Sequence, residues 1–398
     1  MRRVAVVGLG VISSIGSGIE EFWGNLLRGV SGAREVKAFD TSALDRHIGC
    51  EVPSFPEEIE RIRVPADASR TTQLACAAAA LALVDAGLVD DRASRARTGV
   101  AIGTTMGEAQ RVEHPSVREI TPWRHLSNFA CETTALRVAD ALGLEGPIAT
   151  LPTACAAGNY ACAHALDLMR DREADLMLAG GADAFSRMAF IGFSRLLAMS
   201  PDMCRPFDKK RRGLLLGEGA AMLVFEDMER ARARGARIYA ELLGYGLSCD
   251  AHHMTAPHPN GVGAALAMSR ALSDAGVTPS DVDYVSAHGT GTPLNDRIET
   301  MAIKQVFGER AQDVPVSSVK GLLGHAMGAA SAIESVVCSL AIAGGIVPAT
   351  WNHDEADADC DLDYVAGTPR PASVGVALNN AYGFGGNNAC VVFAHTDR

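Results

Sequence analysis

The stretch Ala149-Thr-Leu-Pro-Thr-Ala-Cys-Ala-Ala-Gly-Asn-Tyr160 decides how the rest of the 398-residue chain is interpreted. It places Cys155 among small residues, directly before an apolar-periodic run that continues to Met169. Small neighbours let a ligand reach the sulfur, and the positive end of a helix favours the thiolate, which attacks acyl groups. A lone cysteine is more often a buried structural residue. Three later stretches favour the nucleophile: His288-Gly-Thr-Gly-Thr-Pro-Leu-Asn-Asp296, Lys320-Gly-Leu-Leu-Gly-His325 and Gly383-Phe-Gly-Gly-Asn-Asn388.

The first of these stretches follows a predicted strand and contains a histidine in a Gly/Thr-rich turn. His288 can exchange a proton and a hydrogen bond near neutral pH. Thr290 and Thr292 occupy alternate positions of an extended segment, so both hydroxyls can face one amide-bearing ligand. A turn whose β-branched residues simply pack is the alternative. Asp296 and Glu299 lie at a predicted helix start, where capping is at least as well supported as direct catalysis.

The other two stretches combine a functional group with glycines. Lys320 and His325 precede an Ala/Ser-rich helix. A phosphate cradle of the P-loop type is rejected because its glycines come before the lysine, and a structural lysine that caps carbonyls is the alternative. The glycine-rich turn around Phe384 exposes backbone N–H groups that can stabilise an oxyanion, although a plain hairpin turn is also common.

Composition narrows the class of protein. With 48% hydrophobic residues, 21% charged residues and 40 glycines, the chain can build a large α/β core. Its formal charge of −11 argues against general nucleic-acid binding. Ten cysteines without a C-x-x-C pair indicate a reducing compartment, and neither a disulfide framework nor a zinc site. Without a signal-peptide pattern or an uninterrupted apolar run of membrane-spanning length, we expect a cytoplasmic protein that does not enter a membrane.

Local patterns predict alternating strands and helices. Gly8 and Gly10 invite a dinucleotide reading, but Ser13 replaces the third glycine, so a tight strand exit is favoured. Residues 104–125 are expected to form a loop, and residues 33–66 a loop with a short helix. Strands are predicted over 3–9, 99–103, 174–181, 220–226, 238–245, 282–287, 314–318, 374–379 and 390–394, and helices within 13–28 and over 70–86, 129–142, 155–169, 228–234, 263–275, 298–307 and 326–343.

The order of these elements repeats. Each part of the chain has a strand, a functional turn and a small-residue helix, with Cys155 at the head of one such helix and His325 at the head of the other. We therefore expect two similar α/β halves packed together, residues 1–245 with the cysteine and residues 246–398 with the histidines and the glycine-rich loop.

Taken together, the motifs resemble those of the β-ketoacyl-acyl carrier protein synthases, in the elongating, KAS II-like branch of the thiolase superfamily. The resemblance covers the whole chain and implies a thiolase-like fold of two halves in five αβαβα layers, and a dimer. The matching stretches begin with Val4-Ala-Val-Val-Gly-Leu-Gly10 and continue with Pro152-Thr-Ala-Cys-Ala-Ala-Gly158, Ala179-Gly-Gly-Ala-Asp183, Arg205-Pro-Phe-Asp208, Gly217-Glu-Gly-Ala220, His288-Gly-Thr-Gly-Thr-Pro293, residues 320–330 and Gly383-Phe-Gly-Gly-Asn387.

The resemblance also implies a reaction, without a metal or redox cofactor. Cys155 would take an acyl chain from a carrier-protein thioester. His288 and His325 would then bind the malonyl thioester and assist loss of its carboxylate, and the resulting carbanion would attack the acyl group. The N–H groups of Cys155 and Phe384 would hold the oxyanion, while the Phe384 ring would gate access. A cysteine at a helix end would need no adjacent strong base if its pKa were already lowered.

Supporting roles follow from the same resemblance. Thr290 and Thr292 would contact the amides of the carrier's phosphopantetheine, and Lys320 and Glu299 would order the histidines through hydrogen bonds. Because the carrier protein is acidic, a local basic patch is expected on this acidic chain. Arg195 fits the carrier-contact position, and the weaker candidates are Arg61, Arg63 and Arg70.

Two departures from the family pattern point to a specialised role. Ala-Ala-Gly follows Cys155, where elongating synthases often carry Thr-Ser-Gly or Ala-Ser-Gly, and residues 108–121 form a shorter segment. The chain could therefore be the condensing subunit of a type II polyketide or polyene system, paired with a chain-length-factor subunit, or a homodimeric fatty-acid enzyme. A degradative thiolase would use a second cysteine, but Cys390 lies in a predicted strand. A non-catalytic partner subunit would usually lack the cysteine. Chain length, saturation and the cognate carrier stay open.

Overall fold

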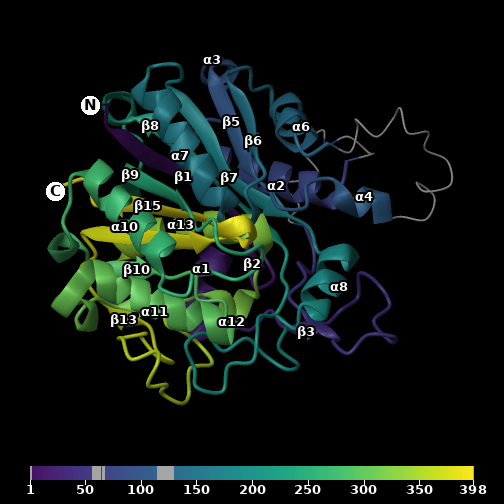
Figure 1. The fold of residues 1–398 in the computed structure, drawn as a ribbon. Coiled ribbons are helices and arrows are strands. Elements are labelled where there is room, and N and C mark those ends of the chain that lie inside the picture. The colour runs from purple at the N-terminus through teal and green to yellow at the C-terminus, as the bar shows by residue number, and fades with distance from the viewer. Residues whose placement is uncertain (1, 56–63, 65–67, 114–129, 398) are drawn as a thin grey trace.

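The computed structural model describes residues 2–55, 64, 68–113 and 130–397. Its centre is one large mixed sheet in the order β6-β5-β7-β8-β1-β9-β15-β14-β10-β11 (Figure 1). The strands of the first half are β1 (Val4–Ser13), β5 (Thr98–Gly103), β6 (Ile148–Leu151), β7 (Leu176–Asp183) and β8 (Gly219–Asp227). Those of the second half are β9 (Ala240–Cys249), β10 (Tyr284–Ser286), β11 (Val316–Ser317), β14 (Val376–Tyr382) and β15 (Asn387–Ala394).

The two halves share one topology. In the first, β5 pairs in parallel with β6 and β7, whereas β8 runs antiparallel to β7 and β1. In the second, β10 pairs in parallel with β11 and β14, whereas β15 runs antiparallel to β14 and β9. A short antiparallel pairing of Val4–Val6 with residues 240–242 joins them. The predicted duplication is therefore present, while the boundary between residues 245 and 246, which falls inside β9, stays a prediction.

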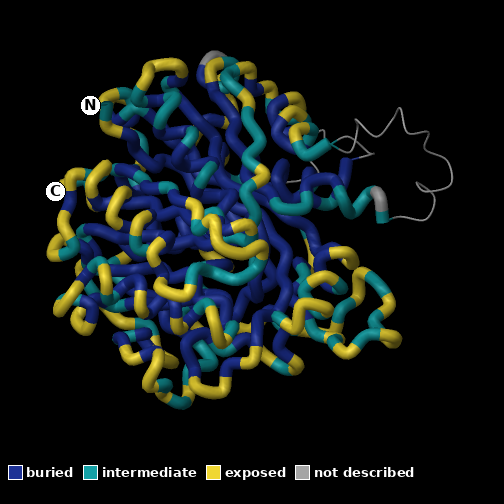
Figure 2. The backbone as a smooth tube through the Cα atoms, in the orientation of Figure 1, coloured by how far each residue is buried: buried dark blue, intermediate teal, exposed yellow. Residues whose placement is uncertain are grey.

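Helices complete five layers, as the family resemblance implies. The outer layer on the first half contains α2 (Arg70–Asp85) and α6 (Thr133–Leu142), and that on the second contains α10 (Val262–Ala275) and α11 (Pro293–Phe307). Between the two halves of the sheet lie α7 (Ala157–Arg170) and α13 (Ala330–Gly344), which contact each other and strands of both halves. Figure 2 shows that buried backbone runs through the interior while exposed segments lie at the periphery.

Small residues make the central layer possible. A Cβ on Gly158 of α7 would lie 2.5 Å from the backbone nitrogen of Ala332 in α13, so this glycine lets the two helices touch. The run Met327–Gly344 is long and apolar enough to cross a membrane, but 89% of it is buried between the sheet halves. It is the core helix of this fold.

The remaining described elements connect these layers. They are β2 (Gly16–Ser17), α1 (Ile19–Arg28), β3 (Arg34–Glu35), β4 (Ile48–Gly49), α3 (Arg92–Ala96), α4 (Ala109–Glu113), α8 (Arg187–Arg195), α9 (Met228–Ala233), α12 (Lys320–Leu323), β12 (Ile346–Val347) and β13 (Arg370–Pro371), with single 3₁₀ turns η3 (Ala154–Ala156), η4 (Pro279–Asp281), η5 (Gly308–Gln312), η6 (Met327–Ala329) and η7 (Phe384–Gly386).

Some local predictions were wrong, and packing explains the clearest case. The first strand continues to Ser13, because Gly8 and Gly10 lie inside β1 and face α2 rather than ending the strand. A Cβ on Gly10 would lie 1.9 Å from the carbonyl oxygen of Ala78. The expected loop 104–125 contains α4, and its residues after 113 lie outside the described part. The described residues 33–55 form β3 and β4 without the expected short helix, and α8 was not predicted.

Candidate active site

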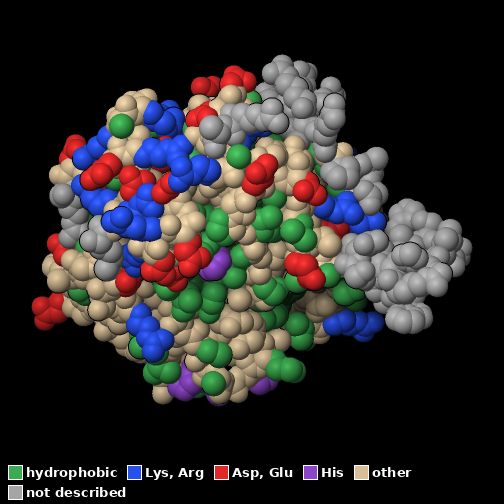
Figure 3. Space-filling model, turned by 90° about the horizontal axis from the view of Figure 1, so that it is seen from above, with side chains coloured by type: hydrophobic (Ala, Val, Ile, Leu, Met, Phe, Trp, Pro, Cys, Tyr) green, Lys and Arg blue, Asp and Glu red, His purple; other side chains and the backbone are tan. Residues whose placement is uncertain are grey.

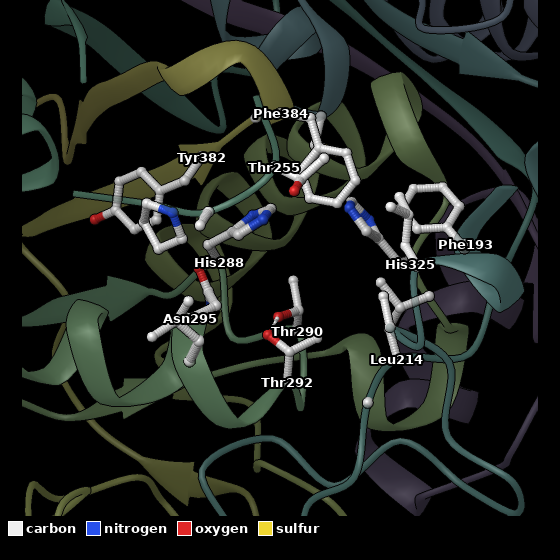
Figure 4. A pocket seen from close by; sticks show the side chains of 18 of the residues that line it. Phe193, Leu214, Thr255, His288, Thr290, Thr292, Asn295, His325, Tyr382 and Phe384 are labelled. Atoms are coloured by element: carbon white, nitrogen blue, oxygen red, sulfur yellow. Dashed lines mark hydrogen bonds between the residues drawn. The ribbon is translucent and has the colours of Figure 1, made fainter. Parts of the chain in front are cut away.

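Four separate turns bring the predicted site residues together at the carboxyl ends of strands. Cys155 follows β6, His288 follows β10, His325 follows β11 and α12, and Phe384 follows β14. Loops at these strand ends are where open α/β sheets bind ligands. All four residues line one cavity of about 330 Å³. Figure 4 shows the two histidines side by side in it, with the threonines below and the Phe384 ring above.

Cys155 lies in η3, immediately before α7, on a strained turn. Ala154, directly before it, has φ 53°, a left-handed conformation that non-glycine residues rarely adopt. Only 4% of Cys155 is exposed. Burial raises its pKa to about 11, although Lys320 and the backbone N–H groups of Phe384 and Cys155 act in the opposite direction. The condition under which Cys155 would need no adjacent base, a pKa already lowered at the helix end, is therefore not met, because desolvation is the larger effect.

The two histidines are held neutral. His288 and His325 are buried, and their rings lie 5.4 Å apart at 83°. Burial lowers the pKa of both imidazoles well below 6.5, and the nearby charge of Lys320 adds to this effect. A neutral imidazole carries one N–H donor and one acceptor nitrogen. The pair can therefore donate hydrogen bonds to a developing enolate oxygen or accept a proton at pH 7.

Lys320 does not contact the histidine rings through the expected hydrogen bonds. Its ammonium group forms a fully buried ion pair with Glu334 of α13. Burial raises the pKa of Glu334 to about 7 even though Lys320 acts to lower it. Lys320 therefore acts on the histidines through its charge. Sequence reasoning missed Glu334, although an isolated acidic residue in an otherwise Ala/Ser-rich buried helix is a usable signal.

Glu299 and Asp296 position the histidine loop from behind. Glu299 accepts the backbone N–H groups of His288 and Gly289, each at 2.8 Å. Asp296 accepts the N–H of Phe207 at 2.7 Å and that of Gly291 at 3.2 Å. Both carboxylates are buried in the first two turns of α11 and neither lines the cavity. Glu299 thus orders His288 through its main chain rather than its ring, and anchoring of the loop explains both residues.

The two threonines and Phe384 shape the entrance. The hydroxyls of Thr290 and Thr292 lie 2.9 Å apart on the same side of their segment, as the alternation predicted, and both residues line the cavity. The Phe384 ring packs 5.5 Å from the ring of Phe193.

The candidate carrier-contact arginines lie in different surroundings. Arg195 is exposed at the end of α8, next to Leu196 and Leu197, which do line the cavity. Arg70 instead forms an ion pair with buried Glu218 at 2.6 Å, so its role is structural. Arg61 and Arg63 lie outside the described residues. In the described part of the chain, no three His, Cys, Asp or Glu side chains are grouped to hold a metal ion.

A thiol within reach of two main-chain N–H donors, facing two neutral imidazoles, is suited to acyl transfer followed by stabilisation of an enolate. On a duplicated α/β fold with a cysteine after the sixth strand, this chemistry is that of the acyltransferases of the thiolase superfamily.

Comparison with known proteins narrows the class. The Beta-ketoacyl synthase N-terminal domain family matches residues 1–231, and its C-terminal domain family matches residues 239–354. The chain belongs to the β-ketoacyl synthase family. It is 39% identical to 3-oxoacyl-[acyl-carrier-protein] synthase 2 of Synechocystis sp., over 98% of each chain. The family resemblance of the sequence is thereby confirmed, as is the class of enzyme, an acyltransferase.

Two solved structures share the whole fold. The ishigamide ketosynthase/chain length factor structure contains a chain 44% identical to this one, with a TM-score of 0.91 over 99% of both. A type II polyketide synthase acyl-carrier protein in complex with its ketosynthase includes a chain 34% identical, also with a TM-score of 0.91, over 99% of this chain and 100% of that one.

Proposed function

We propose that the chain catalyses decarboxylative Claisen condensation of an acyl group, held on Cys155, with a malonyl group carried by an acyl carrier protein. The products are a β-ketoacyl-carrier thioester and CO₂. The observation that carries this proposal is the convergence of Cys155, His288, His325 and the Phe384 loop in one cavity. Family membership supports it, and both degradative thiolysis and a purely non-catalytic role fit this set of groups less well.

In the first half-reaction the Cys155 sulfur attacks the acyl thioester. Because the pKa of this thiol is about 11, a neutral imidazole of the pair is the group that accepts its proton. The oxyanion forms within reach of the N–H groups of Phe384 and Cys155. Collapse of the tetrahedral intermediate breaks the carbon–sulfur bond to the carrier, and the leaving thiolate takes up the proton.

In the second half-reaction the carbonyl oxygen of the malonyl thioester accepts hydrogen bonds from the ring N–H groups of His288 and His325. The C–C bond to the carboxylate breaks, CO₂ leaves, and the electron pair forms an enolate stabilised by these two donors. Its carbon attacks the acyl carbonyl, and the Cys155 thiolate is expelled and takes up one proton from solvent. The hydroxyls of Thr290 and Thr292 face the same cavity and are suited to hydrogen bonds with the amides of a phosphopantetheine arm. None of these steps uses a metal or redox cofactor.

The carrier would dock at the cavity mouth. Two exposed apolar residues form a collar there: Leu197, which lines the cavity and is 82% exposed, and Met254, which is 79% exposed and whose carbonyl accepts the N–H of Gly385. Arg195 lies close to Leu197 in the chain. On the face that Figure 3 shows, Lys and Arg side chains lie interspersed with Asp and Glu side chains, so no patch of a single charge stands out there. We therefore assign apolar contacts by the collar and one cation, Arg195, to carrier docking in the cytoplasm.

A type II polyketide or polyene pathway, with a chain-length-factor-like partner, is the more specific assignment. The higher identity to the ishigamide structure, 44% against 39% for the fatty-acid enzyme, supports it. The edge strand β6 also supports a partner, since the turn that holds Cys155 follows directly after it and Ile148 is 40% exposed. A homodimer that elongates fatty acids is the other assignment.

Intact-protein mass spectrometry tests the proposal. The purified chain, alone and with a partner subunit, is incubated with acyl carriers of several lengths, saturated and polyenoic. A mass shift that maps to Cys155 and disappears in Cys155→Ala is expected, and the preferred chain distinguishes the pathways. Cys155→Gln should still release CO₂ from malonyl carrier without condensing. Retained condensation in Cys155→Ala, or no acylation under any condition, would contradict the assignment.

A further inference from the structure

Tyr382 lies in the active site but has no part in the chemistry above. It is the last residue of β14, only 9% exposed, and it lines the cavity that contains Cys155. Figure 4 shows Tyr382, His288 and His325 in a row. The Tyr382 and His288 rings lie 5.6 Å apart at 64°, an edge-to-face arrangement like that of the two histidines.

His288 needs such a contact because no hydrogen bond to its ring is found among the described residues. In many functional sites a hydrogen bond to the second ring nitrogen sets the orientation of an imidazole. Here Nδ1 of His288 is buried and has no hydrogen-bond partner among the described residues. Glu299 fixes only the main chain of His288. In the part of the chain that the structure describes, packing therefore limits rotation of the imidazole about its side-chain bonds, and the Tyr382 ring forms one side of that packing.

We propose that Tyr382 is a positioning residue for decarboxylation, whose aromatic ring holds the His288 imidazole at the angle needed to donate to the enolate oxygen. The ring carries this role, because the buried Tyr382 hydroxyl has no hydrogen-bond partner among the described residues and, in Figure 4, it points away from the histidines. The proposal rests on the role proposed for His288 above.

The position of Tyr382 at the end of β14 also connects it to the Phe384 turn. Its main chain pairs with Asn388 of β15 and runs directly into Gly383 and Phe384. The end of β14 therefore fixes two things: the Tyr382 ring that contacts His288, and the turn in which the Phe384 N–H faces the Cys155 sulfur. Tyr382 thus links the group that stabilises the enolate to the group that stabilises the acyl oxyanion, and the two need a fixed relative position when the new carbon–carbon bond forms.

Substitutions at this position distinguish ring from hydroxyl. In the Cys155→Gln background, CO₂ release from a malonyl pantetheine thioester is measured for Tyr382→Phe, Tyr382→Leu and Tyr382→Met. The Phe variant keeps the ring and should match the parent. The Leu and Met variants should lose about 10- to 100-fold in kcat, the effect of a misplaced catalytic group, with little change in KM. Two aliphatic variants are used so that the test still holds if one of them misfolds. The fold of each variant is compared with that of the parent by circular dichroism.

Two controls separate this proposal from its premise. With Cys155 intact, Tyr382→Phe should also be acylated at the parent rate, since it keeps the ring that packs against His288. His288→Ala should abolish CO₂ release; if it does not, the proposed role of His288 fails whatever Tyr382 does. The positioning role is overturned if folded aliphatic variants release CO₂ at the parent rate, or if Tyr382→Phe falls as far as they do.

Discussion

At the scale of the residue, Cys155 shows two physical effects in opposition. Main-chain N–H groups and Lys320 favour the thiolate, whereas complete burial favours the thiol. Burial is the larger effect because the 3₁₀ turn η3 is short and the sulfur lies beneath the Phe384 loop. The cysteine is therefore protected when no substrate is bound, and its activation depends on a neighbouring imidazole rather than on a permanent thiolate.

This balance predicts how Cys155 responds to pH. A pKa of about 11 leaves a small thiolate fraction at pH 7, and that fraction grows about tenfold per pH unit below the pKa. Alkylation of Cys155 by iodoacetamide, followed by peptide mapping, should therefore be slow at pH 7 and rise steadily up to pH 10. A plateau near pH 8 would show that the thiol ionises in its ordinary range and would contradict the effect of burial.

Single residues could be found from the sequence only where a motif surrounds them. Cys155, His288 and His325 stand in glycine-rich turns after predicted strands, so their convergence followed from topology. Tyr382 could not be placed in the same way, because it lies in a strand and acquires its role from His288, far away in the chain. Glu334 stands out in the sequence as an isolated acidic residue of a buried helix, but its pairing with Lys320 depends on the fold. The raised pKa of Cys155 could not be predicted for a related reason, since burial is a property of the whole fold.

At the scale of the element, close contact between the two central helices holds the site together. Cys155 directly precedes α7, and His325 lies a few residues before α13. Asn159 of α7 also donates from its backbone N–H to the Ser331 hydroxyl and from its side chain to the Asn379 carbonyl, so both halves share one buried polar network. The helices were predictable from periodicity, whereas the contact between them required knowledge of which glycines face another backbone.

A single methyl group tests this contact. Gly158→Ala would place a Cβ 2.5 Å from the Ala332 nitrogen, so the helices must separate, at an expected cost of about 1–3 kcal/mol in the free energy of unfolding. Because both nucleophile and histidine turns are attached to these helices, acylation and CO₂ release should both slow. Urea unfolding and the two partial reactions measure the effects.

Gly344→Ala is the matched control for that substitution. Gly344 ends α13, and a Cβ there would have no atom within 4 Å. The control should keep full activity and be neutral or more stable by up to about 1 kcal/mol, from helix propensity. Equal effects of the two substitutions would show that the helix contact is not the cause.

At the scale of the whole molecule, the duplicated topology was visible in the sequence as a repeated order of strand, turn and small-residue helix. The pairing of β1 with β9, which makes the two half-sheets continuous, was not, because strand pairing between distant segments leaves no local signal. The same limit applies to assembly. The sheet ends in the edge strands β6 in the first half and β11 in the second, and β6 is next to the nucleophile turn.

An exposed edge strand that carries apolar side chains is a ready surface for another sheet. We expect the chain to form a dimer through β6, with a second copy or with a chain-length-factor-like subunit. Ile148→Lys should then reduce the mass measured by light scattering to that of one chain, alone and after co-expression with the partner. It should also slow acylation, since Thr153 and Cys155 follow that strand.

Val262→Lys on α10 provides the comparison for this change. Val262 is 48% exposed, much like Ile148 at 40%. It begins α10, which packs on β9, β15 and β14 of the second half, whereas β6 is the edge strand of the first half. The control should keep both the dimer and the rate of acylation. If Ile148→Lys remains a full dimer, the interface lies elsewhere. If it is a monomer with an unchanged rate of acylation, each chain completes its own active site, and the partner serves only to determine the chain length of the product.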